Sequence, residues 1–149
     1  MLTKKGKYGL KAALHLAALP PETTASGAEI AARNHIPKKF LDAILLDLRD
    51  AGIVRAKRGP GGGYRLATPP AQIHVGHVIR VLDGPLAPLK CASVSANRPC
   101  EDCPNLERCA VRITMGHVRD AMSAILDRMT LEEMIMFSRV RHPDLMYHI

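Results

Sequence analysis

The feature that most constrains the fold of this chain is residues 59–63, which are four glycines and one proline. A segment with almost no side chains adds little to a core, and its glycines can adopt positive φ angles, so it is predicted to be a tight turn. We predict that residues 53–58 and 64–67 are the two strands of the hairpin that this turn closes. The hairpin carries four basic residues, namely Arg55, Lys57, Arg58 and Arg65. A phosphate-binding loop is excluded, because neither Lys-Ser/Thr nor a helix follows the glycines.

The segment before the hairpin has the pattern of a helix-turn-helix. Ser26 and Glu29 form a predicted capping box that opens a helix over residues 27–34. Pro37 is expected as the first residue of the next helix, and Gly52 is expected to cap its end. One apolar stripe at helical spacing marks that second helix, with Leu41, Ile44, Leu45 and Leu48. Further helices are predicted over residues 5–19 and 71–82.

Charge is divided unevenly along the chain and points to a polyanionic partner. Residues 1–90 hold 14 Lys and Arg against 6 Asp and Glu, whereas residues 91–149 hold 7 against 8. A helix in the major groove can read base edges while a basic hairpin beside it contacts phosphates or enters the minor groove. We predict double-stranded operator DNA as the partner; the alternative is a basic surface that is merely solvated. The expected DNA-binding residues are Lys5, Lys7, Tyr8, Ser26, Lys38, Lys39, Asp42, Arg55, Lys57, Arg58, Gly59, Pro60 and Gly61.

All four cysteines lie in residues 84–109, a predicted loop that also holds four prolines. Their order is Cys91-x8-Cys100-x2-Cys103-x5-Cys109, and four thiolates can hold zinc or an iron–sulfur cluster. Cys109 is expected at the start of a helix, where free backbone amides lower the pKa of a thiol. A thiol redox enzyme using Cys100 and Cys103 is the weaker alternative, because the βαβ context typical of that motif is missing.

A heptad pattern after the cysteines predicts a dimerisation helix over residues 110–129. Its apolar positions are Val111, Met115, Val118, Met122, Ile125 and Met129, spaced 4, 3, 4, 3 and 4. No other helix in the chain matches its length, so we expect a homodimer; the alternative is that the stripe packs on the N-terminal half. A second capping box, Thr130 to Glu133, is expected to open a short helix to about Phe137. The tail from residue 139 is predicted to be loosely held.

The chain is predicted to be cytoplasmic, without a membrane partner. No segment approaches the ~20 uninterrupted apolar residues of a membrane-spanning helix. The N-terminus resembles a signal peptide only superficially, because Lys11 and His15 interrupt the apolar stretch. The predicted division is 1–83 for DNA binding, 84–109 for a sensor loop, 110–138 for dimerisation and a short helix, and 139–149 for the tail.

Four segments carry a family resemblance, namely Gly6-Lys7-Tyr8-Gly9-Leu10, Ala28-Glu29-Ile30-Ala31, Leu48-Arg49-Asp50-Ala51-Gly52 and, most specifically, Arg58-Gly59-Pro60-Gly61-Gly62-Gly63-Tyr64-Arg65-Leu66. They resemble the family of bacterial iron–sulfur and stress regulators that includes IscR, NsrR, RirA and CymR. The resemblance covers about residues 1–135 and implies a homodimeric winged-helix repressor or activator. Many members hold an iron–sulfur cluster in a loop ahead of a long dimerisation helix.

The resemblance also bears on the ligands. Cluster-binding members usually supply three loop cysteines and one non-cysteine ligand, and two sets fit here: Cys91, Cys103 and Cys109, or Cys91, Cys100 and Cys109. A histidine found in some members three residues after the last cysteine is Arg112 in this chain, which makes a fourth cysteine the more plausible ligand.

The expected fold is mainly α with a small β-hairpin, a winged helix-turn-helix followed by a long dimerisation helix. The expected function is that of a DNA-binding transcription regulator, with a repressor favoured and no catalytic residues. An iron–sulfur cluster, [2Fe–2S] or [4Fe–4S], is the favoured cofactor, with zinc or a metal-free thiol switch as alternatives. An RNA-associated zinc module is a further alternative. The signal stays open among nitric oxide, iron supply, cluster status and redox stress.

Overall fold

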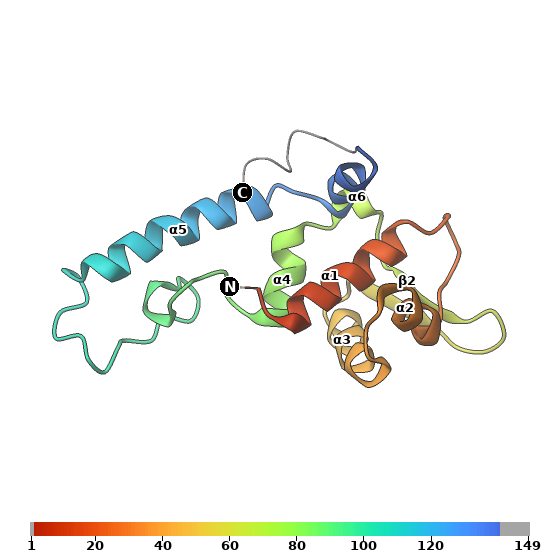
Figure 1. The fold of residues 1–149 in the computed structure, drawn as a ribbon, viewed down its shortest axis with the longest axis horizontal. Helices are drawn as coiled ribbons and strands as arrows, with labels where there is room; N and C mark the ends of the chain where they lie inside the picture. Colours follow the sequence, from red (N-terminus) through yellow and green to blue (C-terminus); the bar gives the residue numbers. More distant parts are fainter. Residues whose placement is uncertain (1, 141–149) are drawn as a thin grey trace.

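The computed structural model describes residues 2–140, and the predicted tail lies outside the described residues from position 141 onward. Its helices are α1 (Lys4–Ala17), α2 (Gly27–Asn34), α3 (Lys38–Asp50), α4 (Val75–Asp83), α5 (Ala110–Leu126) and α6 (Leu131–Arg139). Two strands, β1 (Val54–Lys57) and β2 (Gly63–Leu66), and two short 3-10 turns, η1 (Pro70–Gln72) and η2 (Lys90–Ala92), complete it. Figure 1 shows α1–α4, α6 and the hairpin gathered in one body, from which α5 extends as an arm. This is the predicted mainly α fold with a hairpin.

An aliphatic core holds the body together. The apolar stripe of α3 is fully buried, and α1 and α4 pack against it and against each other. The chain has no Trp and only two Phe, so Leu, Ile, Val and Ala fill this core. The predicted helix-turn-helix is thereby confirmed in its two helices, α2 and α3, and in the buried stripe of α3.

Several predicted boundaries were wrong by a few residues. Pro37 is the N-cap of α3 and not its first helical residue, since its ψ of 127° is not helical. The end of α3 is as expected: Gly52 follows the C-cap Ala51 at a φ of +74°, and the amides of Gly52 and Ile53 donate to the carbonyls of Arg49 and Leu48 (both 2.9 Å) in a Schellman motif. Only half of the predicted capping box at α2 is formed. The Ser26 hydroxyl accepts from the amide of Glu29 (3.1 Å), but the Glu29 carboxylate pairs with Arg33 at 3.6 Å and does not return to the Ser26 amide. α1 ends at Ala17 and not at residue 19, where the chain tightens into a 3-10 turn.

A third backbone segment, at Ala25, pairs with the hairpin, and the sequence did not indicate it. β1 and β2 pair antiparallel, with Val54 opposite Leu66. On the outer side of β2, Ala25 and Tyr64 exchange two backbone hydrogen bonds of 3.0 and 2.7 Å. The segment just before α2 thus fixes the base of the wing against the helix-turn-helix.

The predicted helix over residues 71–82 is divided into η1 and α4. The backbone of Ile73 and His74 is extended there and pairs with the turn before α6, where the Leu131 amide donates to the Ile73 carbonyl (3.0 Å). That turn contains the predicted capping box of Thr130 and Glu133, which is confirmed in both of its hydrogen bonds.

The arm is shorter than the heptad pattern suggested. α5 ends at Leu126, and Met129 lies in the following turn, where its carbonyl accepts from the Val75 amide (2.9 Å). None of the α5 residues is buried. Within residues 2–140, no helix has both the length and the hydrophobicity needed to cross a membrane.

Candidate DNA-binding surface and cysteine cluster

The solvent face of α3 carries three of the residues that were predicted to bind DNA. Lys38, Lys39 and Asp42 are all exposed near the N-terminus of this helix. Lys38 and Asp42 form an ion pair with 2.6 Å between the ammonium nitrogen and a carboxylate oxygen. Lys39 forms no ion pair within the part of the chain that the structure describes. Asp42 is therefore engaged by its own helix in the free protein, whereas Lys39 projects from it.

Helix α1 braces α3 from the side. Lys5 pairs with Asp47 of α3 at 2.7 Å. The Tyr8 ring meets Phe40 edge-on, with 5.7 Å between ring centroids and 88° between planes. Two of the predicted DNA-binding residues, Lys5 and Tyr8, thus also orient the helix, while Lys7 is exposed.

The N-terminus of α1 has an acidic partner that the sequence did not indicate. The backbone amide of Thr3 donates to the Asp83 carboxylate (2.9 Å), and the Thr3 hydroxyl accepts from the amide of Gly6 (3.1 Å). A carboxylate at a helix N-terminus stabilises it by about 0.3–1 kcal/mol when exposed. Asp83 is 80 residues away in sequence, so only the fold brings it there.

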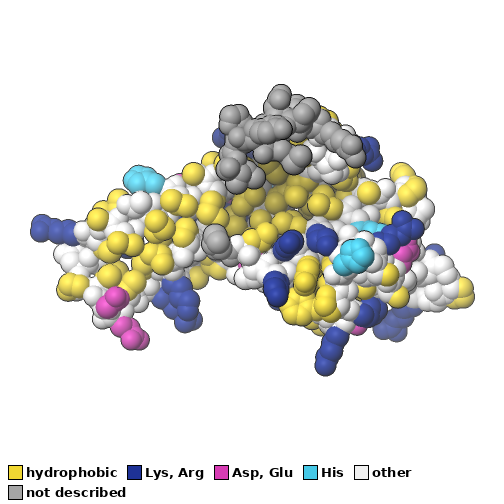
Figure 2. Space-filling view, viewed as in Figure 1, with side chains coloured by type: hydrophobic (Ala, Val, Ile, Leu, Met, Phe, Trp, Pro, Cys, Tyr) yellow, Lys and Arg dark blue, Asp and Glu magenta, His cyan; other side chains and the backbone are white. Residues whose placement is uncertain are grey.

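The wing presents cations around an open tip. Arg55, Lys57 and Arg58 are exposed, and the tip glycines Gly59 and Gly61 have φ angles of +90° and +69°. Figure 2 shows Lys and Arg side chains over the winged-helix half of the molecule. A backbone without side chains at the tip can approach a phosphate or a groove closely.

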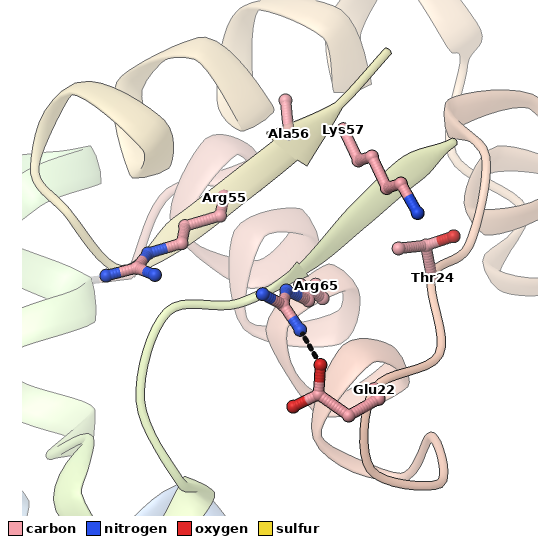
Figure 3. A pocket seen from close by; sticks show the side chains of 6 residues that line it. All are labelled: Glu22, Thr24, Arg55, Ala56, Lys57 and Arg65. Carbon is pink, nitrogen blue, oxygen red and sulfur yellow. Dashed lines mark hydrogen bonds and ion pairs between the residues drawn. The ribbon is translucent and has the colours of Figure 1, made fainter. Parts of the chain in front are cut away.

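One flank of the wing forms a shallow pocket of about 340 Å³ (Figure 3). It is lined by Glu22, Thr24, Arg55, Ala56, Lys57 and Arg65. Arg65 pairs with Glu22 at 2.5 Å, while Lys57 extends toward Thr24 and Arg55 points away along the strand. Arg65 is therefore held by a carboxylate, and the free charge of this flank comes from Arg55 and Lys57.

The four thiols come together beside the N-terminus of α5, and all four are free. Hydrogen bonding to Cys100, followed by burial, raises the pKa of Cys91, so these two thiols are neighbours. Burial, followed by hydrogen bonding to Cys109, raises the pKa of Cys103. The ligand atoms of Cys100, Asp102 and Cys103 lie within 4.8 Å of one another. Cys103 thus links the two ends of the cluster.

Cys109 is the N-cap of α5, as expected. The backbone amide of Arg112 makes the largest contribution to lowering the pKa of this thiol, and the amide of Val111 acts in the same direction. The predicted effect of the helix N-terminus on Cys109 is confirmed.

Two arginines of α5 fasten the cysteine loop to the arm. Arg112 donates from Nε to the carbonyl of Cys91 (2.9 Å) and from Nη1 to the carbonyl of Leu106 (3.3 Å). Arg119 donates to the carbonyl of Ala92. The sequence analysis treated Arg112 only as a missing histidine and did not identify this role, because the partners are backbone atoms that no sequence pattern marks.

The arm is tied to the winged-helix body at its other end. Arg80 of α4 makes a bidentate ion pair with Asp127, at 2.5 and 2.8 Å. Apolar side chains of α5 stay uncovered, among them Val111 and Ile125, each 61% exposed. Figure 2 shows hydrophobic side chains along the visible face of this arm.

Comparison with known proteins decides the family. The Rrf2 model, described as iron-dependent transcriptional regulator, matches residues 2–136. The chain belongs to the Rrf2 family. An rrf2-like regulator of the helix-turn-helix type from Rhodobacter capsulatus is 42% identical to this Rrf2-family chain over 138 residues, covering 91% of the chain and 92% of the relative.

Two solved structures share the fold of this Rrf2-family chain. CymR, the global cysteine regulator of B. subtilis, is 33% identical with a TM-score of 0.73, over 92% of this chain and 97% of that one. IscR of T. potens is 28% identical with a TM-score of 0.72, and the match covers 99% of this chain and 96% of that one. This Rrf2-family chain is accordingly a DNA-binding transcription regulator with a winged helix-turn-helix, and the expected resemblance is confirmed.

Proposed function

We propose that this protein is a homodimeric repressor whose affinity for operator DNA follows the state of an iron–sulfur cluster held by Cys91, Cys100, Cys103 and Cys109. The observation that carries this proposal is the convergence of all four free thiols at the start of the arm. The cluster is of the [2Fe–2S] or [4Fe–4S] type, and the signal is iron supply, nitric oxide, redox stress or cluster status.

On DNA, α3 lies in the major groove and the wing lies along the adjacent backbone or minor groove. Lys39 donates to guanine, and Asp42 accepts from a cytosine amino group once Lys38 turns to a phosphate. Further backbone contacts come from Lys5, Lys7, Tyr8 and Ser26, and from the wing residues Arg55, Lys57, Arg58, Gly59, Pro60 and Gly61. The exposure of Lys39 and of the wing cations supports these roles.

The donor set fits an iron–sulfur cluster. Thiolates are the usual ligands of such clusters, and four are available in one place. Cys109 is already biased toward the thiolate by the amides of α5. The bound cluster supplies metal–sulfur bonds whose integrity depends on iron, oxidants or nitric oxide. Arg112 and Arg119 bind the carbonyls of Cys91 and Ala92, and so fix the backbone that carries the Cys91 thiol relative to the arm.

The arm connects this cluster to the DNA-binding helices. Its N-terminal end carries Cys109, and its C-terminal end is fixed to α4 through Arg80 and Asp127. A second copy of α5 is proposed to cover the apolar face of the arm, so that residues 110–138 form the dimer unit between the sensor loop at 84–109 and the DNA-binding unit at 1–83. A rotation of the arm then changes the spacing of the two recognition helices.

A zinc site is the second candidate, and a specific observation favours it. Cys100, Asp102 and Cys103 place two sulfurs and one oxygen within 4.8 Å, a donor set that zinc also accepts. Zinc would make the loop a structural element or a thiol switch.

Anaerobic purification of the full chain, with an absorption spectrum and counts of iron, acid-labile sulfide and zinc, separates these proposals. We expect visible absorption and stoichiometric iron and sulfide, both lost in a Cys91→Ser/Cys109→Ser variant. Zinc without sulfide would support the second candidate. A chain that stays metal-free and colourless after anaerobic reconstitution with iron and sulfide would contradict the cluster.

A further inference from the structure

The outward face of α3 has an apolar centre. The buried stripe occupies one side of this helix, and at 3.6 residues per turn Lys39, Ala43 and Leu46 lie opposite it within an arc of about 60°. All three are exposed, and Leu46 keeps 46% of its surface accessible. A row of one cation and two apolar side chains therefore points directly away from the core.

Neighbouring elements do not use this row for packing. The elements that pack most closely on α3 are α1, α2, α4 and β1, and the exposure of Lys39, Ala43 and Leu46 shows that this row is left uncovered. The arm with its own apolar face extends from a different part of the body in Figure 1. A single exposed leucine is common on protein surfaces and carries no meaning by itself. What distinguishes Leu46 is its alignment with Lys39 on the helix that faces DNA, between the charged residues Asp42 and Arg49.

The major groove offers one apolar group, the C5 methyl of thymine, and small apolar side chains contact it. We propose that Ala43 and Leu46 contact thymine methyl groups, and that Leu46 thereby selects thymine within the operator half-site. Leu46 lies seven positions after Lys39, a rise of about 10 Å along α3, which corresponds to about three base-pair steps for a helix that runs along the groove. The half-site therefore presents a guanine to Lys39 and a thymine about three base pairs away to Leu46. This inference rests on the proposed placement of α3 in the major groove.

Replacing thymine by uracil tests the proposed methyl contact, because uracil lacks only the methyl group of thymine. The full-length protein first selects an operator from a random duplex pool, and each half-site thymine is then changed to uracil in turn. We expect about fourfold weaker binding at one or two positions, the factor for one buried methyl-sized group. Leu46→Ala should abolish the penalty at one of these positions, whereas Leu46→Met, which keeps an apolar reach, should retain it.

Two controls complete the design. Uracil placed outside the half-site should leave affinity unchanged, and the salt dependence of binding should be the same for wild type and Leu46→Ala, because no charge is altered. Equal affinity for thymine and uracil at every half-site position, or an unchanged uracil profile in Leu46→Ala, would overturn the methyl contact alone. Failure of the wild-type protein to select any sequence would overturn the proposed operator binding together with it.

Discussion

Gly63 is the residue on which the position of the wing depends. Its φ is +146°, and a Cβ added there would lie 2.6 Å from the carbonyl oxygen of Ala25, a backbone atom that cannot turn aside. Gly63→Ala forces an L-residue into a backbone region that glycine alone occupies readily, at a cost of about 1–3 kcal/mol. The clash also displaces β2 from Ala25, and the two hydrogen bonds between Ala25 and Tyr64 are worth about 0.5–1.5 kcal/mol each. The free energy of unfolding should fall by about 2–6 kcal/mol.

Gly61→Ala is the matched control. Gly61 also has a positive φ, +69°, but a Cβ there meets no atom within 4 Å, so only the conformational cost of about 1–2 kcal/mol applies. Urea unfolding of both variants, with hydrogen exchange at the Tyr64 amide, measures the difference. Equal destabilisation of the two variants, or unchanged protection of Tyr64 in Gly63→Ala, would refute the role of Ala25 as the support of the wing.

Three further predictions concern charge, assembly and pH. Arg58→Ala should weaken operator binding and reduce the slope of log affinity against log salt by about one charge, and an unchanged slope in a salt titration would exclude Arg58 from the interface. Ile125→Lys should yield a monomer by light scattering and abolish tight operator binding, because the charge falls on the apolar face of the arm; a wild-type mass of one chain at micromolar concentration would contradict the dimer. Asp127→Asn should lower stability at pH 7 by about 0.2–1 kcal/mol, since both partners are partly exposed. Arg80 lowers the pKa of Asp127, so this difference should vanish as the pH falls through the folded pKa, below the ordinary value of 3.8; thermal unfolding with a pH-independent difference would argue against the pair.

Local patterns in the sequence were sufficient for the winged helix-turn-helix. The glycine-rich turn and the stripe of α3 depend on φ preferences and on burial with a period of 3.6 residues, and both act over a few positions. The sequence-based predictions failed where a residue far away in the sequence determines the local structure. The predicted helix over 71–82 is interrupted where the Leu131 amide donates to the Ile73 carbonyl, and the N-terminus of α1 is bonded to Asp83, which lies 80 residues away from Thr3.

In the cysteine loop, too, the sequence predicted local features but not long-range contacts. The spacing of the thiols and the helix start at Cys109 predicted the kind of ligand and the lowered pKa. The clamps formed by Arg112 and Arg119 could not be predicted, because carbonyl groups 21 and 27 residues away accept their hydrogen bonds. The gathering of the thiols in one loop is visible in sequence spacing, whereas the contacts that orient that loop are long-range.

The most direct test of coupling between the cysteine loop and DNA is a pair of binding isotherms, holo and apo protein on the same operator at fixed salt. A cofactor can shift the DNA-competent population only by its differential interaction with the two states, so the two isotherms should differ, and the Cys91→Ser/Cys109→Ser variant should follow the apo curve whether or not iron and sulfide are supplied. Superimposable holo and apo isotherms, or a double variant that retains full cluster occupancy, would contradict the coupling.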